Sequence, residues 1–136
     1  MIKPKSVKTE ADVKRDIVRD VRANGGYARR IEDQYGVGIL DMILIPYGLP
    51  VFFAEVKLIR SLTFAPTERQ QVELNRIKSA SNAGNHAIPI VIGWKEGVYY
   101  FHKPAQTIHC NDCFSVTSSN MSFYNQLVQY YHSRRT

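Results

Sequence analysis

Two apolar runs of the sequence, ILDMILI and VFFAEVK, contain three charged residues: Asp41, Glu55 and Lys57. The segment between the runs, residues 46–50, is rich in proline and glycine, which is typical of a tight turn, and each run is short enough for one strand. A hairpin centred on Gly48 places Asp41 directly opposite Glu55. Opposed side chains lie on the same face of a sheet, and Lys57 shares this face because side chains alternate along a strand.

The facing carboxylates of Asp41 and Glu55 indicate a binding site for a cation. Two like charges directly opposite each other destabilise a sheet, and burying them without partners costs still more. A hard divalent cation takes oxygen ligands from carboxylates, backbone carbonyls and water, so the pattern predicts a Mg²⁺ or Mn²⁺ site on the hairpin. The alternative is a buried ion network of Asp41, Lys57 and Glu55 without a metal, although an apolar hairpin would be more stable than such a network.

The composition fits one globular domain with an anionic partner. The chain has 136 residues, of which 44% are hydrophobic, enough for a single core. No apolar run reaches the length of about 18 residues that a transmembrane helix needs, and the N-terminal sequence MIKPKSVKTE lacks the apolar core of a signal peptide. We therefore expect a cytoplasmic protein. The net charge of +6 suits a polyanionic phosphate substrate, or else is ordinary solubilising charge.

The two cysteines lie in the segment His109-Cys110-Asn111-Asp112-Cys113. A zinc site needs four ligands, so this segment would have to recruit a further histidine such as His86, His102 or His132. Two reduced cysteines in a loop are the simpler interpretation, and a disulfide is not expected in a cytosolic chain.

Hydrophobic periodicity and turn residues predict an α/β domain. Helices are predicted over residues 9–24, 67–81 and 121–132, and strands over residues 27–31, 38–45, 51–58, 88–94 and 98–102. The remaining segments are predicted to be loops and turns, residues 32–38, 59–66, 82–86 and 103–120. Thr9 is the predicted N-cap of the first helix, with Asp12 at the capping-box position. The near-continuous apolar strands indicate a mixed central sheet with helices on both faces.

Asp41, a thirteen-residue spacer and Glu55-Val56-Lys57 form an Asp…Glu-x-Lys pattern, which resembles the signature of the PD-(D/E)xK nuclease superfamily. More narrowly, the chain resembles the VRR-Nuc family, including its small stand-alone phage and bacterial members. The resemblance covers roughly residues 8–94 and rests on four segments: Glu10, Gly38-Ile39-Leu40-Asp41, Ala54-Glu55-Val56-Lys57 and Thr67-Glu68-Arg69-Gln70. It implies a restriction-endonuclease-like αβββαβ core within a single nuclease domain over residues 1–136, with the core at about 8–102 and a C-terminal extension at about 103–136.

The sequence departs from the family pattern at two places. Leu40 stands where the family usually has proline, which supplies no ligand. Gln70 and Gln71 compete for the family's glutamine position; Gln70 is favoured because Leu74 then falls at the spacing of the family pattern.

The resemblance implies a role for each motif residue. Asp41, Glu55 and the Val56 carbonyl would bind the metal, and Glu10 would bind it directly, through water or through a second metal. The alternative for Glu10 is a carboxylate in the first turn of a helix, where the helix dipole favours it. Lys57 would orient the attacking water or stabilise transition-state charge, and Gln70 would position Lys57 or the water, unless it is simply a solvated residue at a helix start.

The function implied is a Mg²⁺- or Mn²⁺-dependent DNA endonuclease, a homodimer that cuts branched DNA such as four-way junctions in the cytoplasm of a bacterium or a phage-infected host. No organic cofactor and no membrane partner are expected. Four arginines are expected to contact the DNA backbone: Arg29, Arg30, Arg60 and Arg69. The alternatives are a sequence-selective or nicking nuclease of the same fold, and a DNA-binding or assembly module without activity.

Overall fold

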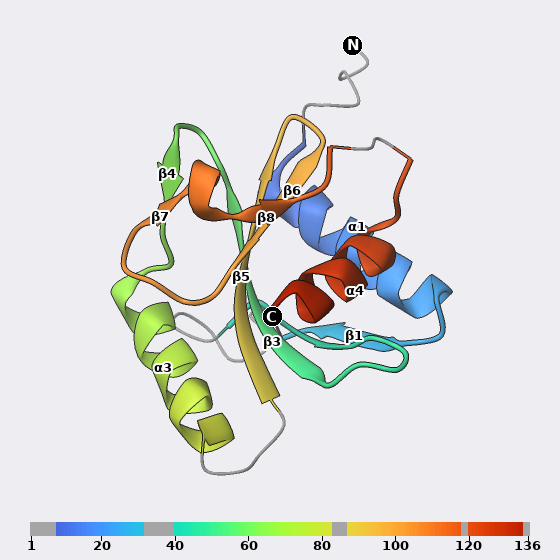
Figure 1. Ribbon diagram of the computed structural model, residues 1–136, viewed down its shortest axis with the longest axis horizontal. Helices are drawn as coiled ribbons and strands as arrows, with labels where there is room; N and C mark the ends of the chain where they lie inside the picture. Colours follow the sequence, from blue (N-terminus) through green and yellow to red (C-terminus); the bar gives the residue numbers. More distant parts are fainter. Residues whose placement is uncertain (1–7, 32–39, 83–86, 118–119, 135–136) are drawn as a thin grey trace.

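The first helix, α1 (Glu10–Ala23), begins at the predicted capping box. The computed structural model describes residues 8–31, 40–82, 87–117 and 120–134 (Figure 1). In α1, the Thr9 hydroxyl accepts a hydrogen bond from the Asp12 N–H at 3.1 Å. The Asp12 carboxylate accepts one from the Thr9 N–H at 3.0 Å. Two otherwise unpaired backbone donors are thus satisfied reciprocally. The inner face of α1 buries Val13, Ile17 and Val21.

A six-stranded sheet forms the centre of the molecule. Its strands, in spatial order, are β1 (Tyr27–Arg30), β2 (Met42–Ile45), β3 (Val51–Leu58), β5 (Ala87–Lys95), β6 (Val98–His102) and β8 (Phe114–Ser115). β3 and β5 run parallel, and the other neighbours are antiparallel. The parallel pair is joined through α3 (Glu68–Asn82), as a parallel connection requires a crossover. The prediction of a mixed sheet is confirmed.

Both faces of the sheet are covered, as the apolar strands predicted (Figure 1). On one face, α1 and α4 (Phe123–Ser133) bury a core that includes Phe52, Leu44 and Leu127. On the other face, α3 and a two-stranded sheet of β4 (Thr63–Phe64) and β7 (Ile108–His109) bury a second core around Leu74 and Val91. Among the described residues, no helix is long and apolar enough to cross a membrane.

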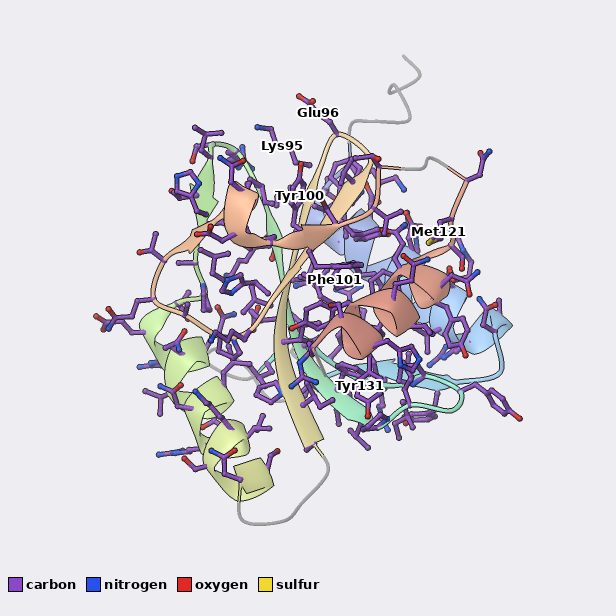
Figure 2. All side chains as sticks on the ribbon, in the orientation of Figure 1. Lys95, Glu96, Tyr100, Phe101, Met121 and Tyr131 are labelled. Atoms are coloured by element: carbon purple, nitrogen blue, oxygen red, sulfur yellow. The ribbon has the colours of Figure 1, made fainter. Side chains whose placement is uncertain are left out.

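The C-terminal segment is built into both cores. Phe101 stacks on Tyr130 of α4 with ring centroids 5.5 Å apart, and lies inside the molecule between sheet and helix (Figure 2). The Asp20 carboxylate of α1 accepts hydrogen bonds from the N–H groups of Phe123 and Tyr124, at 3.1 and 3.4 Å. Ile108 of β7 is buried in the second core. Residues beyond His102 therefore contribute side chains to the same hydrophobic cores as the rest of the chain.

Three segments differ from the sequence prediction. The predicted loop 59–66 contains β4, and the predicted loop 103–120 contains β7, the 3₁₀-helix η1 (Cys110–Asp112) and β8. These strands have two residues each and pair with distant parts of the chain, so they leave no periodic signal in the sequence. β2 begins at Met42, because Asp41 lies in a bend just before it. The predicted loop 32–38, residues 38–39 of the predicted strand and residues 83–86 of the predicted turn lie outside the described residues.

Candidate active site

The β2–β3 hairpin has the register that the sequence predicted. Met42 pairs with Ala54, and Leu44 with Phe52; continuing this ladder by one residue brings Asp41 to Glu55. The Asp41 side chain confirms this proximity, because its Oδ2 accepts a hydrogen bond from the Val56 N–H at 2.8 Å. Asp41 is held from the other side as well, where its backbone carbonyl accepts a hydrogen bond from the Ile31 N–H at 2.9 Å, in line with the β1–β2 ladder.

Asp41 and Glu55 form a buried acidic pair. Asp41 is 3% exposed and Glu55 is fully buried. Within the described part of the chain, neither carboxylate oxygen of Glu55 has a hydrogen-bond partner. Burial, followed by the neighbouring Asp41 carboxylate, raises the pKa of Glu55 to about 10, against the opposing effect of Lys57 and Lys14. Without another cation, Glu55 therefore holds its proton at neutral pH.

These two residues fit a hard divalent cation. Two buried oxygens without a donor are costly in a folded protein, and oxygens of this kind beside a second carboxylate are the donors that Mg²⁺ and Mn²⁺ prefer. The pair is incomplete by itself, since the described residues contain no group of three or more His, Cys, Asp and Glu side chains that could hold a metal ion. The remaining ligands would have to come from backbone carbonyls, water or a more distant carboxylate.

Glu10 is placed near the pair but is separated from it by a lysine. Its Oε1 lies 3.5 Å from Lys14 Nζ, and the same ammonium lies 2.8 Å from Asp41 Oδ1. Its Oε2 accepts a long hydrogen bond of 3.5 Å from the Leu58 N–H, at the end of β3. The structure thus brings the first-helix glutamate to the hairpin, as the motif predicted, with Lys14 between it and Asp41.

Lys14 is the site residue that sequence reasoning missed. The alternative considered from the sequence was an ion network of Asp41 and Glu55 with Lys57; the ammonium that contacts Asp41 belongs to Lys14 instead. The available signal was a lysine placed between the core positions Val13 and Ile17 of α1, four residues after Glu10.

Lys57 lies on the expected face of β3. It is half-buried, and its neighbour in the parallel ladder is Gly93. A Cβ atom on Gly93 would lie 2.5 Å from the end of the Ile59 side chain and 3.0 Å from Phe64. The glycine therefore leaves room for Ile59 and Phe64 to pack against β5.

Gln70 is occupied by its own helix. Its side-chain carbonyl accepts a hydrogen bond from the Thr67 N–H at 2.8 Å, and its N–H donates to the Thr67 hydroxyl at 3.2 Å. This is a capping box at the start of α3. Among the contacts of the described residues, none joins Gln70 to Lys57 or to the carboxylates. Its catalytic role stays a prediction.

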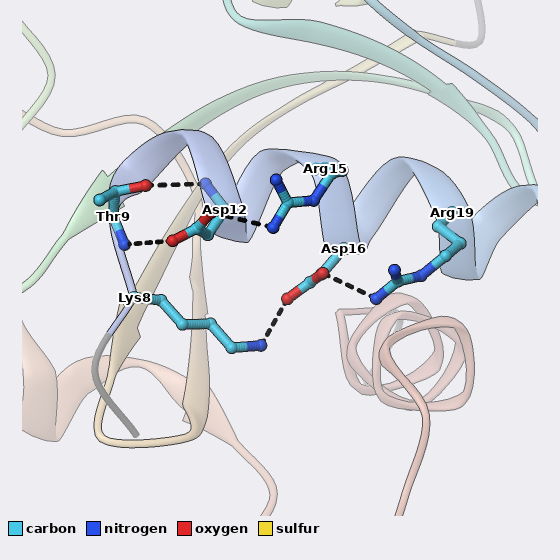
Figure 3. A network of polar contacts seen from close by, with 6 residues as sticks. All are labelled: Lys8, Thr9, Asp12, Arg15, Asp16 and Arg19. Atoms are coloured by element: carbon cyan, nitrogen blue, oxygen red, sulfur yellow. Dashed lines mark hydrogen bonds and ion pairs between the residues drawn. The ribbon is translucent and has the colours of Figure 1, made fainter. Parts of the chain in front are cut away.

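The two neighbouring arginines of β1 lie on opposite faces of the sheet. Arg29 pairs with Ile43, two residues from Asp41, so its exposed side chain shares the carboxylate face. Arg30 lies on the α1 face, where it lines a concavity of about 510 Å³ together with three arginines of α1: Arg15, Arg19 and Arg22. Two of these, Arg15 and Arg19, pair with Asp12 and Asp16 on the same helix (Figure 3).

The other two predicted DNA contacts are exposed at separate places on the molecule. Arg60 follows β3 and lines a shallow concavity with Leu58, Trp94 and Lys95. Arg69 lies in the first turn of α3, exposed to solvent. Both positions allow contact with a large ligand, and neither residue has a contact with the carboxylates among the described residues.

The fold of the chain is similar to that of a known protein. Neither a model of a known family nor a curated protein sequence matches the chain. The fold is shared with a solved structure. Hjc of Archaeoglobus fulgidus, a Holliday junction resolvase from an archaeal hyperthermophile, matches with a TM-score of 0.53 over 80% of this chain and 93% of that chain, at 15% identity. The predicted restriction-endonuclease-like α/β fold is confirmed, and at this identity the likeness shows the fold alone.

Within residues 8–31, 40–82, 87–117 and 120–134, the two cysteines belong to no group of three or more possible metal ligands, and His86 lies outside these residues. Both thiols are free, and their sulfur atoms face the backbone carbonyls of Ser61 and His109. Burial, followed by Cys110 and Asp112, raises the pKa of Cys113 to about 12. Cys113 is therefore a protonated thiol at neutral pH in the metal-free protein.

Proposed function

We propose that this protein is a metal-dependent DNA endonuclease of the VRR-Nuc type that cuts branched DNA such as four-way junctions. The observation that carries the proposal is the buried Asp41–Glu55 pair, with two carboxylate oxygens that have no donor among the described residues and with Lys57 on the same face of the hairpin. A buried carboxylate pair with no bound cation would lower the stability of the fold and would have no compensating role. The junction preference is supported by the fold shared with a Holliday junction resolvase.

The roles of the residues follow from their positions. Asp41, Glu55 and the Val56 carbonyl would hold Mg²⁺ or Mn²⁺, and Glu10 would complete the set through water or a second ion. A bound ion of this kind polarises a phosphodiester oxygen and lowers the pKa of its water. Lys57, the cation that extends from β3 on the same face, would orient that water or stabilise charge on the transition state. Gln70 would position Lys57 or the water after its side chain gives up the hydrogen bond with the Thr67 N–H.

The arginines would position the DNA without reading its sequence. Arg29 shares the face of the carboxylates, and α3, which carries Arg69, covers that face. Arg60 follows the strand that carries Glu55 and Lys57. Arg30 lies on the other face, where it lines the concavity beside α1. DNA with arms in more than one direction can contact both sets at once, which suits a branched substrate better than a linear one.

Two active sites related by a two-fold axis would suit a two-fold substrate, so we propose a homodimer that acts in the cytoplasm of a bacterium or a phage-infected host. Light scattering under cleavage conditions tests the dimer. A monomer that cuts linear and branched DNA equally would contradict both the dimer and the junction preference.

The deciding experiment is cleavage of labelled linear, single-stranded, flap and four-way-junction DNA with Mg²⁺, Mn²⁺ or EDTA. We expect metal-dependent cutting with a preference for the junction, and a loss of at least about 10²-fold in Glu55→Ala, since the metal supplies much of the transition-state stabilisation. The matched control is Glu96→Gln, an exposed carboxylate at the β5–β6 turn that points away from the body (Figure 2).

A second candidate is a DNA-binding module without activity. It is favoured by the Lys14–Asp41 ion pair, which partly neutralises the acidic site without a metal. Tight DNA binding that Asp41→Ala leaves unchanged, together with no cleavage by the wild type, would establish this candidate. Cutting of linear duplex at a defined sequence would instead indicate a restriction or nicking enzyme of the same fold.

A further inference from the structure

Lys14 is a charged residue on the side of α1 that packs against the rest of the molecule. It lies between the core positions Val13 and Ile17, and only 7% of its surface is exposed. Its ammonium extends to the acidic site, 2.8 Å from Asp41 Oδ1 and 3.5 Å from Glu10 Oε1. A buried ammonium is costly unless carboxylates or carbonyls surround it. This lysine is therefore held in place by the same acids that the proposed nuclease would use for its metal.

We propose that Lys14 is the counter-ion of the acidic site in the metal-free protein and that it competes with the divalent cation for Asp41. The inference rests on the proposed function, because it assumes that Asp41 and Glu55 bind a divalent metal. It adds a regulatory property to that site. Before the metal binds, the Lys14 ammonium neutralises the carboxylates of Asp41 and Glu10, and its competition sets the metal concentration at which the site becomes occupied.

The competition follows from the two oxygens of Asp41. Oδ2 is bound to the Val56 N–H, a donor fixed by the backbone of β3. Oδ1 is bound to Lys14, whose ammonium lies at the end of a flexible four-carbon side chain. Oδ1 is thus the oxygen that can turn to a metal, and Lys14 must share it or leave it. An ammonium a few ångströms from a divalent cation is repelled by it.

Glu10 offers the displaced ammonium a second position. Its carboxylate already lies 3.5 Å from Lys14 Nζ, and its side chain is 40% exposed. Glu10 and Lys14 are separated by one helical turn, a spacing at which their side chains meet. Movement of the ammonium toward Glu10 and solvent would free Asp41 without leaving a buried charge unpaired.

The first test is calorimetric titration of Mn²⁺ into the protein without DNA. We expect Lys14→Met to bind Mn²⁺ at least about tenfold more tightly than the wild type, a difference of about 1.4 kcal/mol. Lys14→Arg, which keeps the charge, should stay within about threefold of the wild type. Lys78→Met is the matched control, since Lys78 is exposed on α3 and its loss changes the net charge equally. It should leave the affinity unchanged.

A second measurement uses the wild-type protein, in case Lys14→Met does not fold without metal. Reductive methylation of lysines, read by mass spectrometry, should find Lys14 protected in EDTA and modified several-fold faster with saturating Mg²⁺. Lys78 should react equally in both conditions.

The outcomes separate this inference from the proposed function. Once calorimetry shows that the wild-type protein binds the divalent metal, either of two results would overturn the competition and leave the metal site intact. One is Lys14→Met that binds Mn²⁺ no more tightly, and the other is Lys14 protection that saturating Mg²⁺ leaves unchanged. If Lys78→Met gained as much Mn²⁺ affinity as Lys14→Met, the gain would come from the change in net charge alone. That result would also overturn the proposed competition. Wild-type protein that binds no divalent metal at all would overturn both proposals.

Discussion

Glu55 is fully buried, in an environment far from that of an exposed carboxylate. Its folded pKa of about 10 lies above the ordinary value of 4.5, mainly because of burial. A raised folded pKa gives stability that is fully present below about pH 4.5 and is lost as the pH rises toward about 10. Metal-free protein should therefore lose stability between pH 5 and pH 9, by up to roughly 1.4 kcal/mol per pH unit.

Glu55→Gln should remove this dependence, because an amide cannot ionise. In EDTA, we expect the variant to match the wild type near pH 5 and to exceed its stability increasingly toward pH 9, measured by urea denaturation at each pH. Glu96→Gln, at an exposed turn, should follow the wild type throughout. Parallel curves for wild type and Glu55→Gln would show that Glu55 is not protonated in the metal-free fold.

The site residues that could be predicted from the sequence are those placed by local geometry. The turn at Gly48 fixes the register, and the register brings Asp41 to Glu55. Lys14 reaches Asp41 across the fold, a contact that neither helix nor hairpin specifies alone. The resemblance to the family motif predicts a catalytic role for Gln70, yet the pattern Thr67-x-x-Gln70 also predicts the capping box that the structure shows.

At the scale of elements, one aspartate of α1, Asp20, joins the C-terminal helix α4 to α1. Asp20 accepts two hydrogen bonds from the first turn of α4, and Ser122, the N-cap, accepts a third from Asn125. A carboxylate at a helix N-terminus is favoured by the unpaired N–H groups and by the helix dipole. The docking of α4 thus depends on electrostatics in addition to its buried face.

Replacing Asp20 should loosen this junction. Asp20→Asn keeps the shape but removes the charge, and we expect it to lower the free energy of unfolding by about 1–2 kcal/mol. Chemical denaturation of the variant measures this loss. Asp112→Asn changes an exposed aspartate of η1 and should stay within about 0.5 kcal/mol of the wild type. Equal effects of both substitutions would mean that Asp20 contributes no more than surface charge.

The elements that the sequence predicted are the long ones. α1, β3 and β5 each bury a periodic or continuous apolar face, which is visible in the sequence, whereas the buried residue of α3 is Leu74 and its start is marked by the Thr67-x-x-Gln70 capping box. β4, β7 and β8 have two residues each; β4 pairs with β7, far away in the sequence, and β8 pairs with β6 at the edge of the main sheet. Local sequence carries too little information to place such strands.

At the scale of the whole molecule, the sheet divides the predicted DNA contacts between two faces. Arg29 shares the face of Asp41 and Glu55, whereas Arg30 lines the arginine concavity beside α1. If the proposed function holds, a linear duplex laid across the carboxylates would meet Arg29. A branched substrate has a second arm that would reach Arg30 around the β1 edge of the sheet. The two neighbouring residues should therefore affect different substrates.

Arg29→Ala should weaken binding of linear and four-way-junction DNA alike, and reduce the slope of log K against log salt by about one, because one phosphate contact is lost. Arg30→Ala should weaken binding of the junction and leave the linear duplex nearly unchanged. Salt titrations of labelled DNA, with Glu55→Ala in the background to prevent cleavage, measure both. If Arg30→Ala weakens both substrates equally, the arms of a junction do not divide between the two faces, and the junction preference must come from the dimer instead.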